Sequence, residues 1–557
     1  MSKSFVPTLF SELKKGYSFK SFYNDAVSGA IVGVVALPLA IAFAIASGVN
    51  PAQGLYTAII AGFIISFLGG SKFQIGGPTG AFIVVVADIV AKFGYSGLAM
   101  ATFLAGIMLV IFGLFRFGTA IKFIPYPMTI GFTSGIALII AVTQVKDFFG
   151  LTLTRSPEGF IDKIFLYTSS MDSLNIYSAL IGLLSIFIIV LLPKVTRKLP
   201  GSIVAILAST ILVSIFDLPV DTIGKLFGEI PSSLPMPSLP VIDLRLLPAI
   251  LPSAITIALL GAIESLLSAV VADGMKGTKH NSNVELVAQG IANIASPVFG
   301  GIPATGAIAR TATNIKSGAV SPVSGLMHAF TLLAILLFFA PYAKLIPMSC
   351  LAGILLVVAY HMSEWKVFVK LLKSPKPDIA VMIITFLLTV FIDLTVAIET
   401  GVVLSALLFM NRMASTTEVR HINKELDDDE IDDADLHGRI FPKGLEIFEV
   451  FGPFFFGATN HFKDTLSIVD YTPEVLILRL RHINMIDATA LRALQDIIAK
   501  TQSDGTRLIL SGVNDDLMEV LQKSGTTTLV GENNIYNHIE IALEVAERYL
   551  DIKKADS

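Results

Sequence analysis

Long apolar segments fill the first three quarters of the chain, and they restrict its fold more than any other feature. A helix that crosses a bilayer needs about 20 mostly apolar residues. Only 15% of the sequence is charged, against about 25% in soluble proteins, so we predict an α-helical polytopic membrane protein. Twelve segments are read as ordinary spans: Val27–Gly48, Gly54–Leu68, Gly97–Phe115, Met128–Phe148, Tyr177–Leu192, Ser202–Phe216, Ile250–Val271, Val287–Phe299, Pro322–Phe339, Leu345–Tyr360, Ile379–Ile392 and Leu394–Met410.

Two further segments, Pro78–Ala91 and Pro303–Lys316, are shorter, and each begins with a Gly/Pro break. They bring the total to fourteen, which divides into two halves of seven. An odd number of spans per half inverts the second half relative to the first, and each short segment is then the third of its half. Gly/Pro-interrupted segments at corresponding positions are a pointer to a transporter's binding site.

The charges of the loops orient these segments. The longest loops on one side, 147–175 and 217–248, carry mixed charge. Basic residues concentrate in the alternate loops, as expected on the cytoplasmic side, which places both termini in the cytoplasm. The N-terminus lacks the pattern of a cleaved signal peptide. The basic residues are Lys14, Lys15, Lys20, Lys72, Arg116, Lys122, Lys194, Arg197, Lys198, Lys276, Lys279, Lys316, Lys366, Lys370, Lys373, Lys376 and Arg412.

The C-terminal part reads differently. We assign residues 1–25 to a cytoplasmic N-terminal segment, 26–413 to the membrane domain, and 414–438 to a linker with the acidic run Glu425–Glu430, which is typical of a solvated spacer. Residues 439–557 alternate strand and helix patterns, with strands at Leu445–Val450, Val475–Leu480 and Arg507–Ser511 and helices at Thr459–Val469, Thr489–Thr501 and after Asp515. This pattern predicts a small α/β domain.

The two breaks carry the first candidate site. A helix N-terminus has unpaired N–H groups and a partial positive charge, so two opposed half-helices would bind an anion. Small residues at the breaks would let it approach the backbone, and two hydroxyls would add hydrogen bonds; these are Thr79, Gly80, Thr305, Gly306 and Ala307. The alternative is that both breaks are ordinary packing kinks, but their matched positions favour the binding site.

Two ionisable residues accompany this site. Glu264 lies in the middle of a predicted span, where a carboxylate is a functional hypothesis by default; Ser268 is on the same face at i+4. The carboxylate would load a proton, or hold a cation such as sodium, or merely pair with a basic partner. Arg310, two turns into the second short segment, would supply positive potential to an anion, pair with Glu264, or extend towards the membrane surface.

Other kinds of chemistry find little support. Cys350 is the single cysteine, which excludes a disulfide framework and a cysteine metal site. There is no P-loop, dinucleotide fingerprint or nucleophile elbow, so we expect neither an enzyme nor a cofactor, metal or nucleic-acid site. In the α/β domain Asp487 is a plausible helix N-cap, and Thr489 would be exposed in the first turn, where a phosphate is tolerated. A plain cap is the simpler interpretation.

With these residues in view, the sequence resembles the SulP anion transporters, which end in a STAS domain, and in particular their bacterial DauA/YchM-type branch of C4-dicarboxylate carriers. The matching text includes Ala36–Ala44, Pro51–Tyr56, Gly77–Gly80, Gly261–Leu267 and Asp273–His280. It departs at Leu39, where animal members usually carry Gln, and at Gln53, where the family text has Tyr.

The resemblance implies two inverted seven-segment repeats forming a core and a gate domain, an elevator mechanism, a homodimer, and a place in the bacterial inner membrane. It implies substrate contacts at Leu39, Phe43, Thr79, Gly80, Thr305 to Ala307 and Arg310, a coupling carboxylate at Glu264, and a regulatory STAS motif at Asp487 and Thr489. A cytoplasmic partner of the STAS domain is also implied.

These observations predict a secondary transporter, most directly one for proton-coupled uptake of C4-dicarboxylates such as succinate, fumarate or aspartate, with sodium as the less favoured coupling ion. One alternative keeps the class and changes the ion to sulfate, bicarbonate or another small anion. A second is a channel-like conductor, whose current would not saturate. A third is a membrane-anchored signalling protein whose output is the STAS domain.

Overall fold

The computed structural model describes residues 5–119, 125–155, 157, 159–196, 200–241, 243–392, 394–422, 441–466 and 472–556. Lys122, Arg197, Lys198 and the acidic run Glu425–Glu430 lie outside the described residues. The chain forms two compact units, Met1–Ser405 and Ala406–Ser557, and each is described by itself.

Every one of the fourteen predicted segments contains helix, and nine helices in the described part of the chain are long and apolar enough to cross a membrane. The first short segment and the span after it form one helix, α4, which is broken at Gly94 with φ 67° and ψ −174°. The helices are α2 (Phe19–Ala46), α3 (Pro51–Leu68), α4 (Phe82–Leu114), α5 (Tyr126–Phe149), α7 (Ile176–Val195), α8 (Gly201–Phe216), α10 (Leu247–Lys276), α11 (Ser282–Val298), α12 (Ile308–Lys316), α13 (Val323–Ala343), α14 (Met348–Met362), α16 (Lys376–Phe391) and α17 (Leu394–Ser415).

Short helices lie between or before these spans: α1 (Thr8–Lys14), α6 (Gly159–Ser169), a 3-10 turn at Met171–Ser173, α9 (Ile223–Phe227) and α15 (Trp365–Leu371). Many large apolar side chains on the spans are exposed, among them Leu183, Leu207 and Phe338. A soluble protein rarely shows such extended apolar surface, whereas a bilayer covers it. The polytopic fold predicted from the sequence is therefore confirmed.

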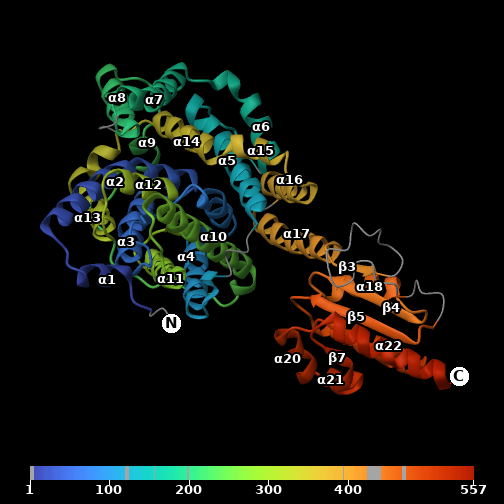
Figure 1. Ribbon diagram of the computed structural model, residues 1–557. Helices are drawn as coiled ribbons and strands as arrows, with labels where there is room; N and C mark the ends of the chain where they lie inside the picture. The colour runs from blue at the N-terminus through green and yellow to red at the C-terminus, as the bar shows by residue number, and fades with distance from the viewer. Residues whose placement is uncertain are drawn as a thin grey trace. The chain divides into compact units, whose positions relative to one another are not determined.

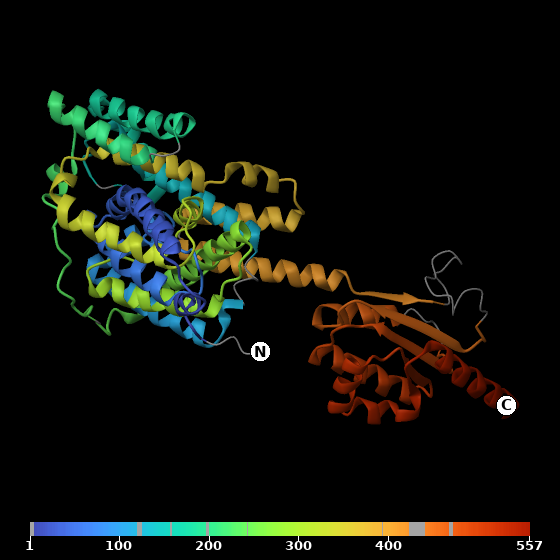
Figure 2. The same cartoon turned by 60° about the vertical axis from the view of Figure 1, so that its left-hand side comes forward.

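The spans pack in two groups. In the core group α11 packs on α4 and α3, α13 on α2 and α3, and α10 on α4 and α12. In the gate group α14 and α16 pack on α5, and α7 packs on α8 and α14. Figures 1 and 2 both show α7 and α8 at the edge of the unit, away from α3 and α11. The boundary between the core group and the gate group frames the candidate site.

The second unit is built on a five-stranded sheet in the order β3-β4-β5-β6-β7. β3 (Glu418–His421) is antiparallel to β4 (Leu445–Phe451), and β5 (Val475–His482), β6 (Arg507–Ser511) and β7 (Ile535–Tyr536) continue in parallel. The strands predicted at Leu445, Val475 and Arg507 are confirmed. The helices are α18 (Thr459–Leu466), α19 (Ala488–Ser503), α20 (Asp515–Lys523), α21 (Thr526–Val530) and α22 (Ile539–Asp556), with 3-10 turns at Phe456–Ala458 and Glu532–Asn534.

Alternate residues of these strands bury opposite faces of the sheet, as the two-residue period of a strand requires. In β5, Leu476 and Leu478 pack with α18, α19 and α20, whereas Val475 and Ile477 pack with α22. Helices thus cover both faces, the layered α/β architecture that the sequence predicts.

The structure corrects one detail of the predicted linker. Helix α17 continues to Ser415, and β3 follows at Glu418–His421 and pairs with β4 through Val419 opposite Val450. The sheet therefore begins inside the segment 414–438 that we predicted as a spacer. The sequence pattern hid this strand because it has only four residues and stands beside the acidic run.

Candidate functional site

The two interrupted segments meet directly in the core group. Just before α4, β1 (Gly76–Gly77) pairs antiparallel with β2 (Thr305–Gly306), which precedes α12; Gly76 is opposite Gly306 and Gly77 is opposite Thr305. The Ala307 N–H donates to the Ile75 carbonyl at 2.8 Å. The N-termini of α4 and α12 follow within a few residues, so the positive ends of their dipoles lie at a common centre. At the start of α4 the N–H groups of Phe82 and Ile83 donate to the carbonyls of Thr79 and Gly80. Paired helix ends of this kind are typical of anion-binding sites.

A carboxylate stands at the edge of this centre. Thr79, in the first break, donates its hydroxyl to Glu264 Oε2 at 2.9 Å. Thr79 is buried, whereas Glu264 on α10 is only partly buried. The structure thus brings together the first-break hydroxyl and the mid-span carboxylate, two residues that are 185 positions apart in the chain.

The second break is tied to α10 by a relay of hydroxyls. Gly306 N–H donates to Ser265 Oγ at 3.2 Å, Ser265 Oγ lies 2.7 Å from Thr305 Oγ1, and Thr305 donates to the Gly261 carbonyl at 3.0 Å. The Thr305 proton is therefore engaged within the protein. Ser265 was not singled out in the sequence analysis. The available signal was a second polar residue directly after Glu264 in an apolar span.

Ser268, which we expected to share the ion-coupling site with Glu264, is fully buried and donates to Thr311 Oγ1 at 3.1 Å. Thr311 Oγ1 also accepts from Ile75 N–H at 3.0 Å. Ser268 thus joins α10 to α12 and to the first break. The helical spacing predicts that Ser268 lies on the same face of α10 as Glu264. On that face Ser268 contacts Thr311 of α12.

Arg310 is buried, with 3% of its surface exposed. Its Nη2 donates to the Pro78 carbonyl. Its Nη1 lies so close to Gly77 that a Cβ added there would stand 2.7 Å away. Arg310 therefore braces the second half-helix against the first break. The predicted ion pair between Arg310 and Glu264 is not formed among the described residues, where Glu264 accepts from the Thr79 hydroxyl and Arg310 donates to the Pro78 carbonyl.

The remaining predicted substrate contacts are Phe43, Gly80 and Leu39. Phe43 lies beside Gly80, and Leu39 lines a cavity. A Cβ added at Gly80 would lie 3.7 Å from Phe43 on α2, 3.3 Å from Met362 Sδ on α14 and 3.9 Å from Ile140 on α5. Apolar side chains of the core and gate groups thus cover the start of α4. Leu39, one helical turn before Phe43, lines a cavity to which Gly80 does not contribute.

Two cavities flank this centre, both between the core group and the gate group. One, with a volume of about 660 Å³, is lined by residues 84–92 of α4 together with parts of α5, α6, α10, α16 and α17. The other, of about 730 Å³, is lined by the second half of α12 (Thr313, Lys316) with parts of α2, α7, α8 and α14. Neither cavity is lined by Thr79, Gly80 or Glu264. Each half-helix therefore faces its own cavity beyond its N-terminus.

A second buried carboxylate, missed in the sequence analysis, holds the first break in place. Glu285 on α11 is fully buried. Its Oε2 accepts from the N–H groups of Gly70 (2.8 Å) and Ser71 (3.1 Å). Its Oε1 accepts from the amides of Gln74 (3.0 Å) and Gln289 (2.9 Å). Four hydrogen bonds converge on one carboxyl group, so Glu285 ties the first break to α11.

We expect Glu285→Gln to lower the thermal unfolding temperature of the detergent-purified protein by several degrees. The amide would point an N–H group at other donors, and leaving a buried donor without its hydrogen bond costs about 1–3 kcal/mol. Glu229→Gln is the control, because Glu229 is exposed and pairs with Lys344 at 2.9 Å, and surface pairs contribute little. Equal unfolding temperatures for the two variants would contradict the role of Glu285 in holding the first break in place.

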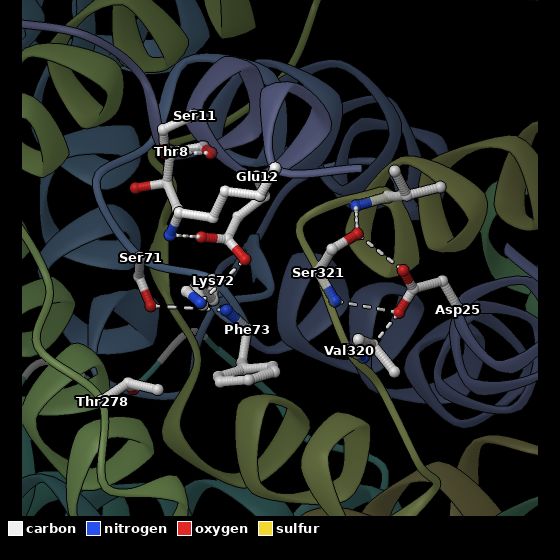
Figure 3. Close-up of polar contacts among 12 residues, drawn as sticks. Thr8, Ser11, Glu12, Asp25, Ser71, Lys72, Phe73, Thr278, Val320 and Ser321 are labelled. Carbon is white, nitrogen blue, oxygen red and sulfur yellow. Dashed lines mark hydrogen bonds and ion pairs between the residues drawn. The ribbon is translucent and has the colours of Figure 1, made fainter. Parts of the chain in front are cut away.

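Helix α1 and the start of α2 hold the loops next to both broken segments (Figure 3). Thr8 N–H in α1 donates to the Gly69 carbonyl at 2.9 Å, and Glu12 pairs with Lys72 at 2.8 Å. Burial opposes ionisation of Glu12, but hydrogen bonds from Lys15 and Lys72 outweigh it and hold the pKa of this carboxyl below its ordinary value. Helix α1 is thereby attached to the loop before β1.

Asp25 in α2 does the same for the segment after α12. It accepts from the N–H groups of Val320 (2.7 Å) and Ser321 (3.1 Å), from the Ser321 hydroxyl (2.6 Å) and from the Tyr17 hydroxyl (2.7 Å). Figure 3 shows the Asp25 carboxylate turned towards Val320 and Ser321. The loops next to both half-helices are therefore fixed by carboxylates that the sequence analysis did not single out.

Two further sequence observations find a structural account. Gln53 closes a capping box with Asn50 at the start of α3, accepting from Asn50 N–H at 3.0 Å. In the second unit Asp487 caps α19 by accepting from Ala490 N–H at 2.8 Å, and it also accepts from Phe456 N–H at 3.1 Å. Thr489 is exposed in the first turn of α19. The N-cap geometry is as predicted.

In the part of the chain that the structure describes, no group of three or more His, Cys, Asp or Glu side chains is placed to hold a metal ion. The chemistry available at the centre is therefore that of backbone N–H groups, hydroxyls, one guanidinium and one carboxylate.

Comparison with known proteins agrees with this architecture. Residues 22–385 match the sulfate permease family, and residues 440–542 match the STAS domain. The chain is 43% identical to YvdB of Bacillus subtilis, a protein named as a sulfate transporter, over 95% of this chain and 98% of that protein. It is 32% identical to the bicarbonate transporter BicA of Synechocystis, over 95% of both chains.

Solved structures show the same fold. The transmembrane domain of a cyanobacterial bicarbonate transporter BicA superposes with a TM-score of 0.61 at 32% identity, covering 70% of this chain and 98% of that one. The murine anion transporter Slc26a9 superposes with a TM-score of 0.87 at 18% identity, covering 98% and 94%.

Proposed function

The chain belongs to the sulfate permease family, and on that premise we propose that it is a cation-coupled secondary transporter of a small inorganic oxyanion, with sulfate as its first substrate. The observation that carries this proposal is the pairing of β1 with β2, which sets the N-termini of α4 and α12 at one centre. Backbone N–H groups and dipole ends suit a compact anion with several acceptor oxygens. The 43% identical relative named as a sulfate transporter supports this choice.

Bicarbonate is the second candidate, supported by the likeness to BicA. The C4-dicarboxylates that we first predicted have less support. That prediction had the two carboxylates of the substrate bound by the two opposed helix N-termini and by Arg310. The relatives described above are named for sulfate and bicarbonate. Arg310 does not decide between the substrates, because its Nη2 donates to the Pro78 carbonyl while its Nη1 has no hydrogen-bond partner among the described residues.

Coupling is proposed to run through Glu264 and Thr79. Thr79 now donates its single hydroxyl proton to Glu264, and so cannot donate it to an anion. If Glu264 takes up a proton, it becomes a donor to Thr79 Oγ1, and the Thr79 hydroxyl is released to the anion. A sodium ion held by Glu264 and the Thr79 oxygen would also turn the Thr79 O–H bond away from Glu264 and leave it free to donate to the anion.

The same change removes a repulsion. Two like unit charges 4 Å apart cost roughly 4 kcal/mol at an effective dielectric constant of 20, so an anion at the helix ends and an ionised Glu264 disfavour each other. Binding of a cation and binding of the anion therefore promote one another, which is what symport requires.

Movement of the core group against the gate group would open the two flanking cavities in turn. Their placement at the core–gate boundary, each along one half-helix, supports this elevator-type exchange. We further propose a homodimer in the bacterial inner membrane with cytoplasmic termini, and a regulatory role for the second unit at Asp487 and Thr489, open to a cytoplasmic partner.

The test is uptake of labelled sulfate, bicarbonate and succinate into proteoliposomes, with an inward gradient of protons, of sodium, or of neither. We expect saturable sulfate uptake that rises with one of the two gradients. Uptake of succinate with none of sulfate or bicarbonate would reinstate the dicarboxylate assignment. Anion flux that neither saturates nor responds to a gradient would indicate a channel.

A further inference from the structure

We propose that Lys163 on α6 is the capture site through which the anion enters the 660 Å³ cavity before it reaches the helix ends. The inference rests on the proposed function, because it names the place where the same substrate is first held. Lys163 lies outside the central site, and the ligand proposed for it is a small oxyanion.

Lys163 is placed at the right point for such a role. It lines the cavity that runs along α4 from Val84, in the first turn after the N-terminus, to Lys92 near the Gly94 break. At a rise of 1.5 Å per residue this stretch of helix is about 12 Å long. Lys163 belongs to α6, which lies outside the spans, and it lines this cavity together with residues of α4.

Among the described residues that line this cavity, the charges other than that of Lys163 cancel. Asp88 and Lys92, which also line it, neutralise each other at 2.8 Å. Asp162, next to Lys163 in the chain, is paired with Arg155 at 2.6 Å. Among the described residues no acidic side chain pairs with Lys163. A lysine is strongly hydrated and is rarely left half-buried without a partner.

Burial lowers the pKa of Lys163 below its ordinary value, since no nearby carboxylate offsets the loss of water around the ammonium group. A bound oxyanion would supply the missing charge. Two residues with hydroxyl groups, Ser253 and Thr395, also line the cavity. A single cation at a cavity mouth raises the local anion concentration and the rate of entry, and salt screens the effect.

The experiment compares wild-type protein with Lys163→Gln, Lys163→Arg and Lys225→Gln. Lys225 is exposed and paired with Asp221 at 2.6 Å, and it belongs to a loop on the side of the membrane predicted for α6, so its variant removes the same charge away from the cavity. Sulfate uptake is measured in intact cells and in inverted membrane vesicles, at low and at high ionic strength.

We expect Lys163→Gln to raise the KM for uptake by intact cells about 3- to 10-fold at low ionic strength, with kcat unchanged. The difference should shrink at high salt and be absent in inverted vesicles, where the anion enters from the other side. Lys163→Arg should restore the wild-type KM, and Lys225→Gln should leave it within twofold.

The proposal is overturned if Lys163→Gln has the wild-type KM at low salt, if it changes KM equally from both sides, or if it lowers kcat with KM unchanged. It is equally overturned if Lys225→Gln raises KM as much as Lys163→Gln does. A wild-type protein that transports no inorganic oxyanion would refute the proposed function itself, which is a different result from any of these.

Discussion

Glu264→Gln is expected to abolish gradient-driven accumulation of the anion while exchange of labelled for unlabelled anion continues. A glutamine amide can donate to Thr79 Oγ1 as a protonated Glu264 would, so the Thr79 hydroxyl becomes permanently available to the anion. The variant should therefore still bind the anion, but a proton or sodium gradient should no longer increase uptake. Its ratio of internal to external anion should fall to about 1.

The measurement uses proteoliposomes in two modes, net uptake under a proton or sodium gradient and counterflow with no gradient. Glu229→Gln is the control, since it removes an exposed carboxylate paired with Lys344 and should retain both activities. Gradient-driven accumulation by Glu264→Gln that equals the wild type would refute the coupling role. Loss of both modes in a correctly folded protein would mean that Glu264 holds the site together and does not couple it.

The second large effect is expected from one added methyl group. Gly77→Ala should lower anion transport by about a hundredfold or more. The new Cβ would lie 2.7 Å from Arg310 Nη1 and 3.3 Å from the Ala58 Cα, and the backbone has φ +145°, which favours glycine. Backbone strain costs about 1–3 kcal/mol, and displacing Arg310 from the Pro78 carbonyl forfeits a charged hydrogen bond of similar size.

A matched control separates crowding of Arg310 from backbone strain. Gly48→Ala also places a side chain at positive φ (+76°), but nothing lies within 4 Å of the new Cβ. Transport rates are measured for both variants at equal amounts of membrane-inserted protein. If Gly77→Ala transports within twofold of Gly48→Ala, the contact between the first break and Arg310 is not needed for the site.

Much of this protein could be predicted from its sequence because the physics involved is local. Twenty apolar residues in a row have few stable solutions other than a membrane helix, and a Gly/Pro break is visible wherever it occurs. The two interrupted segments, the mid-span Glu264 and the strands from Leu445 to Ser511 could therefore be found without any contact information. The N-cap at Asp487 follows equally from a short-range rule.

The partners of these residues could not be predicted, because they depend on which helices pack together. Sequence spacing placed Ser268 beside Glu264, but α12 packs on that face of α10 and Thr311 takes the hydroxyl. Arg310 had three possible roles, and only the antiparallel pairing of β1 with β2 put the Pro78 carbonyl next to its guanidinium. Glu285 and Asp25 looked unremarkable because their donors come from distant segments.

The sequence by itself thus determined the membrane fold, the inverted repeat and the chemical types present at the centre, since apolar length, charge placement and helix breaks act over a few residues. The tertiary structure alone decided that the Thr79 hydroxyl contacts Glu264 and that the Arg310 guanidinium contacts the Pro78 carbonyl. A buried hydrogen bond is made only where two segments bring donor and acceptor within about 3 Å, and that closeness is a property of the packed helices.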